Sequence, residues 1–551
     1  MVQEKWQTLA EAAQKLRDDS AKQVDDYFPP RQGSKHWNPL PDPLPNNVTG
    51  LLKQYLDPAD FDIVETDPIE LLDNLARRQI SAMEVAGAYI RAAIIAQRTI
   101  NCVTEFLPEI AYERAKYLDE YIAEHGRPVG PFHGLPISIK AMMSLKGKRI
   151  NTGVTHGSDR IAEEDAQIVR ILRDNGANFY VRTTQPQILM HIEGDSFING
   201  VTQNPFNRTL TSGGSSAGEG AILGMHASSL GVGTDIGGSI RWPAIAQGQY
   251  GFRPTTNRLP IGGGEHFMYG AEAIPASIGP MARTLEAAIL FSRVVIESEP
   301  WKEDPHLSGI PWNKDPLKGR KTLRIGIMSD DGVVRPHPPV LRAVREVANR
   351  IKKAGSVDGI DLELVDYKPY EPEQAWEIIS SLYFEDGGKE VLGLLEETGE
   401  PVAELTKWLI HDNPNVRELT ISELWKLNDR KAQYKLDHVK HWNSHNIDVL
   451  ICPVGPGGAA PHNHSKYWGY TAHWNLVDYP SVTFPVTSVD SKVDVVDESY
   501  IPRNDKDKFN HELYHPDRFE HAPIGLQLVA LRSHDELVLE AMKLVERAIR
   551  A

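Results

Sequence analysis

Two Gly-Gly-Ser elements lie close together in residues 211–241, which read TSGGSSAGEGAILGMHASSLGVGTDIGGSIR. Glycine pairs allow turns with positive φ and leave backbone N–H groups uncovered, and successive uncovered amides form a site for negative charge. The second element places Ser239 directly after Gly237 and Gly238. A hydroxyl beside converging amides is what acyl transfer needs when a carbonyl oxygen becomes an oxyanion. The pattern predicts a serine nucleophile at Ser239, and a purely structural glycine turn is the alternative interpretation.

A serine hydroxyl is a poor nucleophile without a base. None of the 20 histidines stands in a comparable glycine-bounded setting, so the usual base has no candidate. Lysine is the other known option. Lys140 ends the run HGLPISIK (133–140), at the tip of an apolar strand, where burial would lower its pKa and favour the neutral amine. An isolated lysine at a strand end is more often a surface residue, so this prediction depends on the burial of Lys140.

The elements that must position these residues alternate between apolar runs and helical periodicity. We predict strands at Pro136–Ile139, Phe179–Arg182, Leu230–Gly233, Leu323–Met328, Val449–Val454 and Leu526–Leu528. Helices are predicted at Asp165–Arg173, Pro339–Lys353 and Asp535–Arg550. Strands that alternate with helices indicate an α/β sandwich.

The N-terminal part of the chain is expected to be a helical layer. A Pro-rich stretch, Phe28–Pro45, is expected to be irregular. After it, Thr66 or Asp67 can cap a helix that begins at Pro68. Ser81 and Glu84 form a capping box for a second helix, and a third helix is predicted at Pro108–Tyr121.

No repeat, heptad pattern or low-complexity linker divides the chain. We therefore expect residues 1–60 to form a partly irregular extension and residues 61–551 to form one catalytic domain. Pro300–Arg320 and Val489–Arg518 are polar and rich in Pro, Asp and Lys, which is typical of surface excursions.

The composition excludes several classes of protein. With 41% hydrophobic and 24% charged residues among 551, the chain has the balance of a water-soluble globular protein. The net charge of −16 argues against a nucleic-acid partner. Two cysteines are too few for a disulfide framework, and we find neither a signal peptide nor a transmembrane anchor. We expect a cytoplasmic protein.

Three ordered blocks carry a resemblance to a known family: GLPISIK (134–140), GGSSAGEGA (213–221) and GVGTDIGGSIRWPA (231–244). They resemble the amidase signature family, in particular its acetamidase or general-amidase branch, which is related to the fatty acid amide hydrolases. The intervals between the blocks agree as well, and the similarity covers most of residues 60–545. The resemblance implies an open α/β/α sandwich around a large mixed β-sheet.

The resemblance also implies a mechanism. Ser239 would be the nucleophile, Ser215 after a cis peptide bond would relay the proton, and Lys140 would be the base. The first step would form an acyl-enzyme on Ser239 and release the amine or ammonia. Water would then attack the acyl-enzyme and release the acid. No metal and no organic cofactor are implied.

Further residues receive roles by the same resemblance. The substrate-binding residues would be Leu189, Met190, Ser215, Ile236, Gly237, Gly238 and Ser239, with the amides of residues 236–239 holding the oxyanion. Ser216, Asp235 and Arg241 would support the loops. Two departures from the family pattern stand beside the site: Ala141 replaces the usual acidic residue after the lysine, and Ala217 replaces a glycine.

Other interpretations stay open. Residues 214–218 fit GxSxG with Ser216 as the nucleophile of an α/β-hydrolase esterase, but that motif needs a preceding strand and residues 207–212 are polar. An anion- or nucleotide-binding protein lacks support, because GxxxxGK[ST] is absent and the glycines miss the GxGxxG spacing. An amidase-like subunit that acts with a partner remains an alternative. The expected ligand is a small-molecule amide, and a homodimer is left open.

Overall fold

The computed structural model describes residues 5–550. Its centre is a mixed β-sheet of 12 strands in the order β1-β3-β2-β6-β8-β7-β13-β14-β12-β9-β11-β10, and β4 and β5 form a separate pair. The strands are β1 Val103–Phe106, β2 Pro136–Lys140, β3 Asn178–Thr183, β4 Asp195–Ser196, β5 Gly200–Val201, β6 Leu230–Asp235, β7 Tyr250–Arg253, β8 Ser277–Ala282, β9 Thr322–Ile327, β10 Ser356–Val357, β11 Ile360–Asp366, β12 Val449–Pro453, β13 Ser481–Ser488 and β14 Pro523–Ala530.

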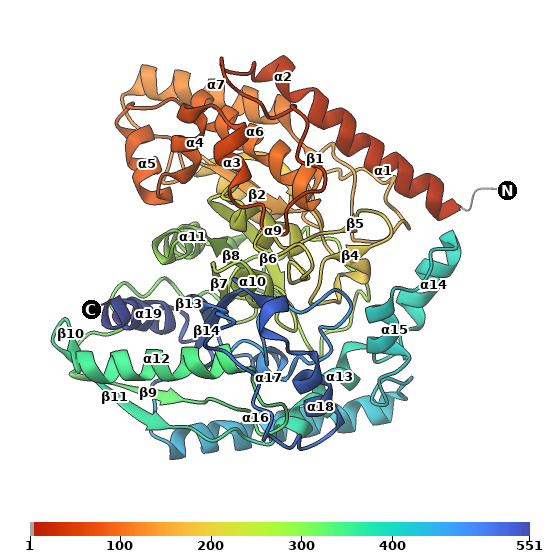
Figure 1. Ribbon diagram of the computed structural model, residues 1–551, viewed down its shortest axis with the longest axis vertical. Coiled ribbons are helices and arrows are strands. Elements are labelled where there is room, and N and C mark those ends of the chain that lie inside the picture. Colours follow the sequence, from red (N-terminus) through yellow and green to blue (C-terminus); the bar gives the residue numbers. More distant parts are fainter. Residues whose placement is uncertain (1–4, 551) are drawn as a thin grey trace.

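Helices surround this sheet. They are α1 Lys5–Lys22, α2 Val24–Tyr27, α3 Leu51–Tyr55, α4 Pro58–Glu65, α5 Pro68–Ala76, α6 Ala82–Ile100, α7 Pro108–His125, α8 Gln167–Asp174, α9 Ala217–Gly224, α10 Arg241–Ala246, α11 Leu285–Glu297, α12 Pro338–Ala354, α13 Pro372–Tyr383, α14 Lys389–Thr398, α15 Glu404–Ile410, α16 Ile421–Ser444, α17 Gly469–Val477, α18 Asp505–Leu513 and α19 Asp535–Arg550. Helices α2–α7 gather at one end of the molecule, α12 and α16 lie at the other, and β6, β7 and β8 lie between (Figure 1).

Both faces of the sheet are covered, as strand β12 illustrates. Successive side chains of a strand point to opposite faces. Val449 and Ile451 belong to a hydrophobic cluster with residues of α12 and α19, whereas Leu450 and Cys452 belong to a second cluster with residues of α16 and α17. The expected α/β sandwich around a large mixed sheet is confirmed.

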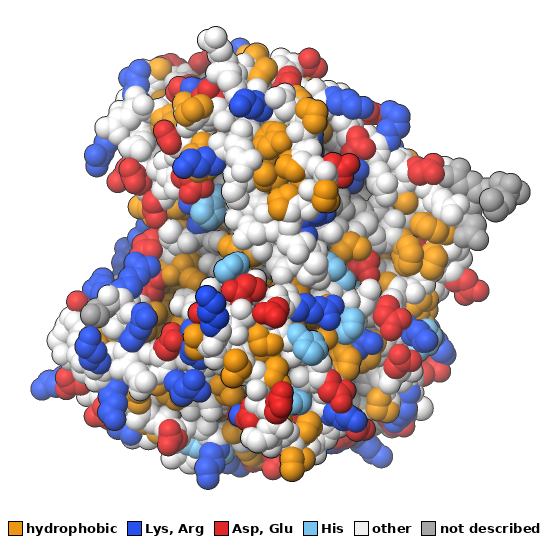
Figure 2. All heavy atoms as spheres, in the orientation of Figure 1, with side chains coloured by type: hydrophobic (Ala, Val, Ile, Leu, Met, Phe, Trp, Pro, Cys, Tyr) orange, Lys and Arg blue, Asp and Glu red, His pale blue; other side chains and the backbone are white. Residues whose placement is uncertain are grey.

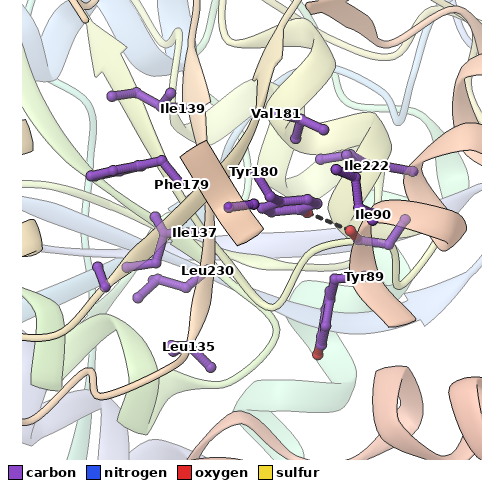
Figure 3. Packing of buried hydrophobic residues seen from close by; sticks show 14 of the residues in the cluster. Tyr89, Ile90, Leu135, Ile137, Ile139, Phe179, Tyr180, Val181, Ile222 and Leu230 are labelled. Carbon is purple, nitrogen blue, oxygen red and sulfur yellow. Dashed lines mark hydrogen bonds between the residues drawn. The ribbon is translucent and has the colours of Figure 1, made fainter. Parts of the chain in front are cut away.

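The N-terminal helices pack against the first half of the sheet. Side chains from α6, α9, β2, β3 and β6 meet in one buried cluster (Figure 3), where the rings of Tyr89 and Tyr180 lie edge to face at 6.2 Å. The capping box of Ser81 and Glu84 is present at the start of α6, and Asp67, not Thr66, caps α5. The helical layer predicted from the sequence is therefore confirmed.

The six strands and the helices predicted from the sequence are confirmed, with ends that differ by a few residues. The other helices were not predicted, among them α1, α4, α11 and the helices between residues 372 and 444. For α1 the reason is visible in its burial: it buries only Ala10, Ser20 and Ala21, so its sequence carries little apolar periodicity. The division at residue 60 stays a prediction, and the sheet itself is continuous.

The surface mixes charges of both signs with scattered apolar side chains on the face that Figure 2 shows. Of the helices within residues 5–550, none combines the length and the apolar character needed to cross a membrane.

A buried ion pair joins two helices of the N-terminal layer and gives a stability prediction. Arg91 on α6 donates to both oxygens of Asp60 on α4, at 2.7 and 2.9 Å, and the Asp60 side chain is fully buried. Asp60→Asn leaves the guanidinium charge without its buried partner, which typically costs about 3–5 kcal/mol of unfolding free energy. Urea denaturation should show a clearly lower midpoint than that of the unchanged protein.

Asp73→Asn is the matched control for this prediction, because the Asp73 side chain is exposed and its carboxylate lies 4.0 Å from the Arg77 guanidinium. Exposed pairs of this kind contribute about 0–1 kcal/mol. Equal midpoints for the Asp60 and Asp73 variants would contradict a stabilising role for the buried pair.

Candidate active site

Lys140 is the last residue of β2 and is fully buried. Ile137 and Ile139 alternate along the strand with Ser138 and Lys140, so the two polar side chains share one face. The Lys140 Nζ atom lies 2.7 Å from Ser215 Oγ and 2.9 Å from Thr234 Oγ1. The structure therefore brings Lys140 and Ser215 together, and Thr234 is a third member that the sequence did not identify.

Burial lowers the pKa of Lys140 to about 7, although the negative charges of Asp235 and Glu219 oppose this shift. An ordinary lysine titrates near 10.4. A substantial fraction of the Lys140 amine is therefore neutral near pH 7, and a neutral amine has a lone pair that can accept a proton.

Ser215 lies just before helix α9, and its peptide bond with Gly214 is cis, as the family resemblance implies. Residue 214 must be glycine, because a Cβ atom there would lie 2.1 Å from the carbonyl oxygen of Glu193. The next residue ties this segment to the second glycine-rich loop: the Ser216 amide donates to the Ser239 carbonyl at 3.1 Å. The two serine-bearing segments thus lie side by side.

Ser239 lies in the loop between β6 and α10 and is 5% exposed. Its hydroxyl forms no hydrogen bond with another residue in the range 5–550. A direct bond between the Ser215 and Ser239 hydroxyls, which the proton relay requires, is therefore not formed in this structure. The backbone bond between residues 216 and 239 is what holds the two segments together.

The Asp235 carboxylate organises the loop that carries Ser239. It accepts from the Gly238 amide at 2.9 Å, from the Ile240 amide at 3.1 Å, and from Nε and one Nη of Arg241 at 3.0 Å each. Asn475 on α17 also donates to Asp235, and Arg241 in turn donates to Asn475 and Gln527. Burial would raise the pKa of Asp235, but Arg241 outweighs it and holds the pKa well below its usual range.

This network changes the expected set of oxyanion donors. The Gly238 amide already donates to Asp235, so it is not free to bind substrate, contrary to the prediction from the sequence. The amides of Ile236, Gly237 and Ser239 have no acceptor among the described residues. Three of the four predicted backbone N–H donors are therefore free to donate to a substrate oxygen.

Two hydroxyls from distant helices brace the same loop. Tyr383 on α13 donates to the Ile236 carbonyl at 2.9 Å, and Thr471 on α17 donates to the Gly237 carbonyl at 2.7 Å. Because both carbonyls are bonded from outside, the intervening peptide groups are held in place. Neither residue could be identified from the sequence, since both come from helices that lack a motif.

The predicted pocket residues Leu189 and Met190 are separated by the structure. Met190 lies in one hydrophobic cluster together with Trp242, and Ile236 packs against this cluster. Leu189 belongs to a different cluster, which contains Met142 and Met143. Ile188 and Leu189 have φ of 53° and 63°, a conformation uncommon for residues other than glycine.

The side chain of Gln187 fixes this loop. It donates to Glu400 at 2.7 Å and to the Pro401 carbonyl at 2.9 Å, and it accepts from the Thr406 hydroxyl at 2.8 Å. The positive φ values of the two following residues are therefore held by contacts with residues 400–406.

Ser216 is fully buried and bonds within the protein. Its hydroxyl accepts from the Thr234 amide at 3.2 Å and lies 3.3 Å from the Thr234 carbonyl. No strand precedes it within residues 202–215, so the strand required by the esterase interpretation is missing. The supporting role of Ser216 stays a prediction.

The two departures from the family pattern are accommodated. Ala217 begins α9 with a negative φ, so its methyl group causes no backbone conflict. Ala141 is buried, and Arg182 donates to its carbonyl. Within residues 5–550, no three His, Cys, Asp or Glu side chains come together as potential metal ligands.

Comparison with known proteins agrees with this geometry. Residues 84–539 match the family model described as Amidase. A Schizosaccharomyces pombe protein whose name assigns it to the amidases is 43% identical over 506 residues, which are 91% of this chain and 93% of that protein. The acetamidase of Emericella nidulans is 36% identical over 496 residues, covering 88% and 89% of the two chains.

The solved structure of a fatty acid amide hydrolase matches with a TM-score of 0.90 at 32% identity, covering 99% of this chain and 95% of that one. The match extends over the sheet and its surrounding helices. The chain therefore belongs to the amidase signature family of amide-hydrolysing enzymes.

Proposed function

We propose that this enzyme hydrolyses a carboxylic amide to an acid and an amine or ammonia through an acyl-enzyme on Ser239. The observation that carries the proposal is the 2.7 Å contact between the buried Lys140 amine and the Ser215 hydroxyl. A buried lysine without a carboxylate in direct contact is costly to keep charged. Its neutral form is the base that a serine nucleophile needs where histidine is absent.

The proton would travel in two steps. Lys140 Nζ lies within hydrogen-bond distance of both Ser215 and Thr234. In its neutral form it would keep an N–H donated to Thr234 and accept the Ser215 hydroxyl proton with its lone pair. Lys140 takes the proton of Ser215 while Ser215 takes that of Ser239. This requires the Ser239 hydroxyl to rotate about χ1 toward Ser215 when substrate binds, because the two hydroxyls are not bonded in the free protein. Catalytic hydrogen bonds often tighten only in the substrate complex.

The Ser239 oxygen would then attack the carbonyl carbon of the amide. The charge that develops on the carbonyl oxygen is stabilised by the free amides of Ile236, Gly237 and Ser239. When the C–N bond breaks, the proton held by Lys140 returns through Ser215 to the leaving nitrogen. A water molecule then attacks the ester on Ser239 by the same proton path and releases the acid.

The substrate class is proposed only in outline. Relatives carry the name acetamidase, and the matching structure carries the name fatty acid amide hydrolase, so a series from acetamide to long-chain acyl amides spans the range to assay. We further propose that the enzyme acts in the cytoplasm and that residues 61–551 form the catalytic domain, and a homodimer stays a prediction.

Separate alanine variants test the assigned nucleophile and base. Ser239→Ala and Lys140→Ala should each lower kcat/KM for the best amide about 10⁴-fold or more, because triad members act as a unit. Ser216→Ala removes only a supporting hydrogen bond worth about 0.5–1.5 kcal/mol and should retain at least about a tenth of the activity. Loss of activity in Ser216→Ala with retention in Ser239→Ala would favour the esterase-type nucleophile.

The pH dependence of kcat/KM follows from the pKa of Lys140. Because the neutral amine is the base and its pKa is about 7, kcat/KM should rise as pH increases through this value and level off above it. Stopped assays over roughly pH 5 to 9 would measure the curve. A profile that is flat across that range would show that Lys140 does not titrate in the catalytic step.

Thr234 provides a test of the orientation of Lys140. Thr234→Val keeps the shape of the side chain and removes the acceptor at 2.9 Å. Loss of a hydrogen bond to a group that becomes charged is worth about 1.5–3 kcal/mol, so kcat should fall about 10- to 100-fold. Thr256→Val is the control, because that buried hydroxyl donates to Asp478. Equal rates for both variants would argue against orientation by Thr234.

A further inference from the structure

A second carboxylate, Glu219, is buried close to Lys140 and has no role in the proposed reaction. Glu219 lies in the first turn of α9, four residues after Ser215, and is fully buried. Ser138 Oγ donates to its Oε2 and Thr183 Oγ1 donates to its Oε1, each at 2.6 Å. Both distances fall in the range of hydroxyl bonds to an ionised carboxylate.

Both donors lie next to Lys140. Ser138 precedes it by two positions on the same face of β2, and Thr183 is its register partner on β3. Neighbouring strands are about 5 Å apart, so the carboxylate lies beside the stem of the lysine. Gly231 on β6 makes room for it, because a Cβ atom at that position would lie 1.8 Å from Glu219 Oε2.

The charges around Lys140 differ in how they are balanced. Asp235 is paired with Arg241. Glu219 accepts only from hydroxyls, and no lysine or arginine among residues 5–550 donates to it. Three other titratable groups interact electrostatically with Glu219. The charge of Lys140 lowers the pKa of Glu219, and the charge of Glu219 raises the pKa of Cys102 and of Tyr180. The residue directly after Lys140 is Ala141 and carries no charge.

We propose that Glu219 is a positioning residue for Lys140. The buried negative charge of Glu219 sets the pH at which Lys140 becomes a neutral base. This inference rests on the proposed function only in calling Lys140 the base. Burial raises the pKa of Glu219 to about 7, against the effect of its two hydroxyl donors and of Lys140, so the two groups titrate in the same range. Protons then leave the pair in two coupled steps.

The sign of the effect follows from electrostatics. An ionised Glu219 favours the ammonium form of Lys140, so removing the negative charge makes the amine lose its proton at lower pH. Glu219→Gln should therefore lower the titration midpoint of Lys140 by about one pH unit, the size typical of a nearby charge. The acidic limb of kcat/KM should move to lower pH by the same amount.

The test is a direct titration of Lys140 by NMR in full-length protein with ¹³C-labelled lysine ε-carbons. The Lys140 signal is the one that Lys140→Ala removes. Glu219→Gln should lower the midpoint, and Glu219→Asp, which keeps the charge, should stay nearer to the unchanged protein. If the glutamine variant does not fold, Thr183→Val takes its place, because loss of that donor weakens the ionised form of Glu219 and should shift the midpoint the same way by less.

Asp535→Asn is the matched control, since Asp535 is a buried carboxylate that accepts from the Thr255 hydroxyl at 2.7 Å. An unchanged Lys140 midpoint in Glu219→Gln, or an equal shift in Asp535→Asn, would overturn the inference. The NMR midpoint does not require turnover, so it separates the two proposals. Full amidase activity in Lys140→Ala would refute the assigned base, whatever the midpoint.

Discussion

The burial of one lysine amine between two hydroxyls is the interaction on which the site depends. Lys140 Nζ contacts Ser215 Oγ and Thr234 Oγ1 at the end of a strand, and its side chain is fully buried. The loss of hydration favours the neutral amine, which is the form that the proposed reaction needs as its base. Lys140 lies on an interior strand of the sheet, between β3 and β6, and its side chain is fully buried there. A lysine on an edge strand would reach water and remain protonated.

The rest of the fold supplies rigid supports for two glycine-rich loops. Asp235 and Arg241 form a fully buried ion pair that closes the loop before α10, and Asn475 and Gln527 fill its remaining hydrogen-bonding positions. Buried ion pairs are favourable only when their other polar atoms are satisfied, as they are here. The supports come from both halves of the sheet and from α17. Residues that are far apart in the sequence therefore hold the peptide groups of residues 236–240 in position.

The apolar strand before Lys140, the two Gly-Gly-Ser elements and their order could be predicted from the sequence, because periodicity and glycine placement are local signals. Glu219 and Thr234 lie inside the motif blocks 213–221 and 231–244. The linear sequence, however, does not indicate that their side chains lie near Lys140. Tyr383 and Thr471 come from helices with no motif, so only the fold shows that they brace residues 236 and 237. The Gly238 amide was predicted to be free, and its bond to Asp235 shows that amide availability is decided in three dimensions.

In the proposed mechanism Lys140 activates Ser239 through Ser215, although the two serine hydroxyls are not bonded in the free protein. The most direct measurement is the rate and position of covalent labelling by a small fluorophosphonate, followed by mass spectrometry of the peptides. Modification should fall on Ser239 and slow by orders of magnitude in Lys140→Ala and in Ser215→Ala. Modification of Ser216, or labelling of Ser239 at an unchanged rate in both variants, would contradict the claim.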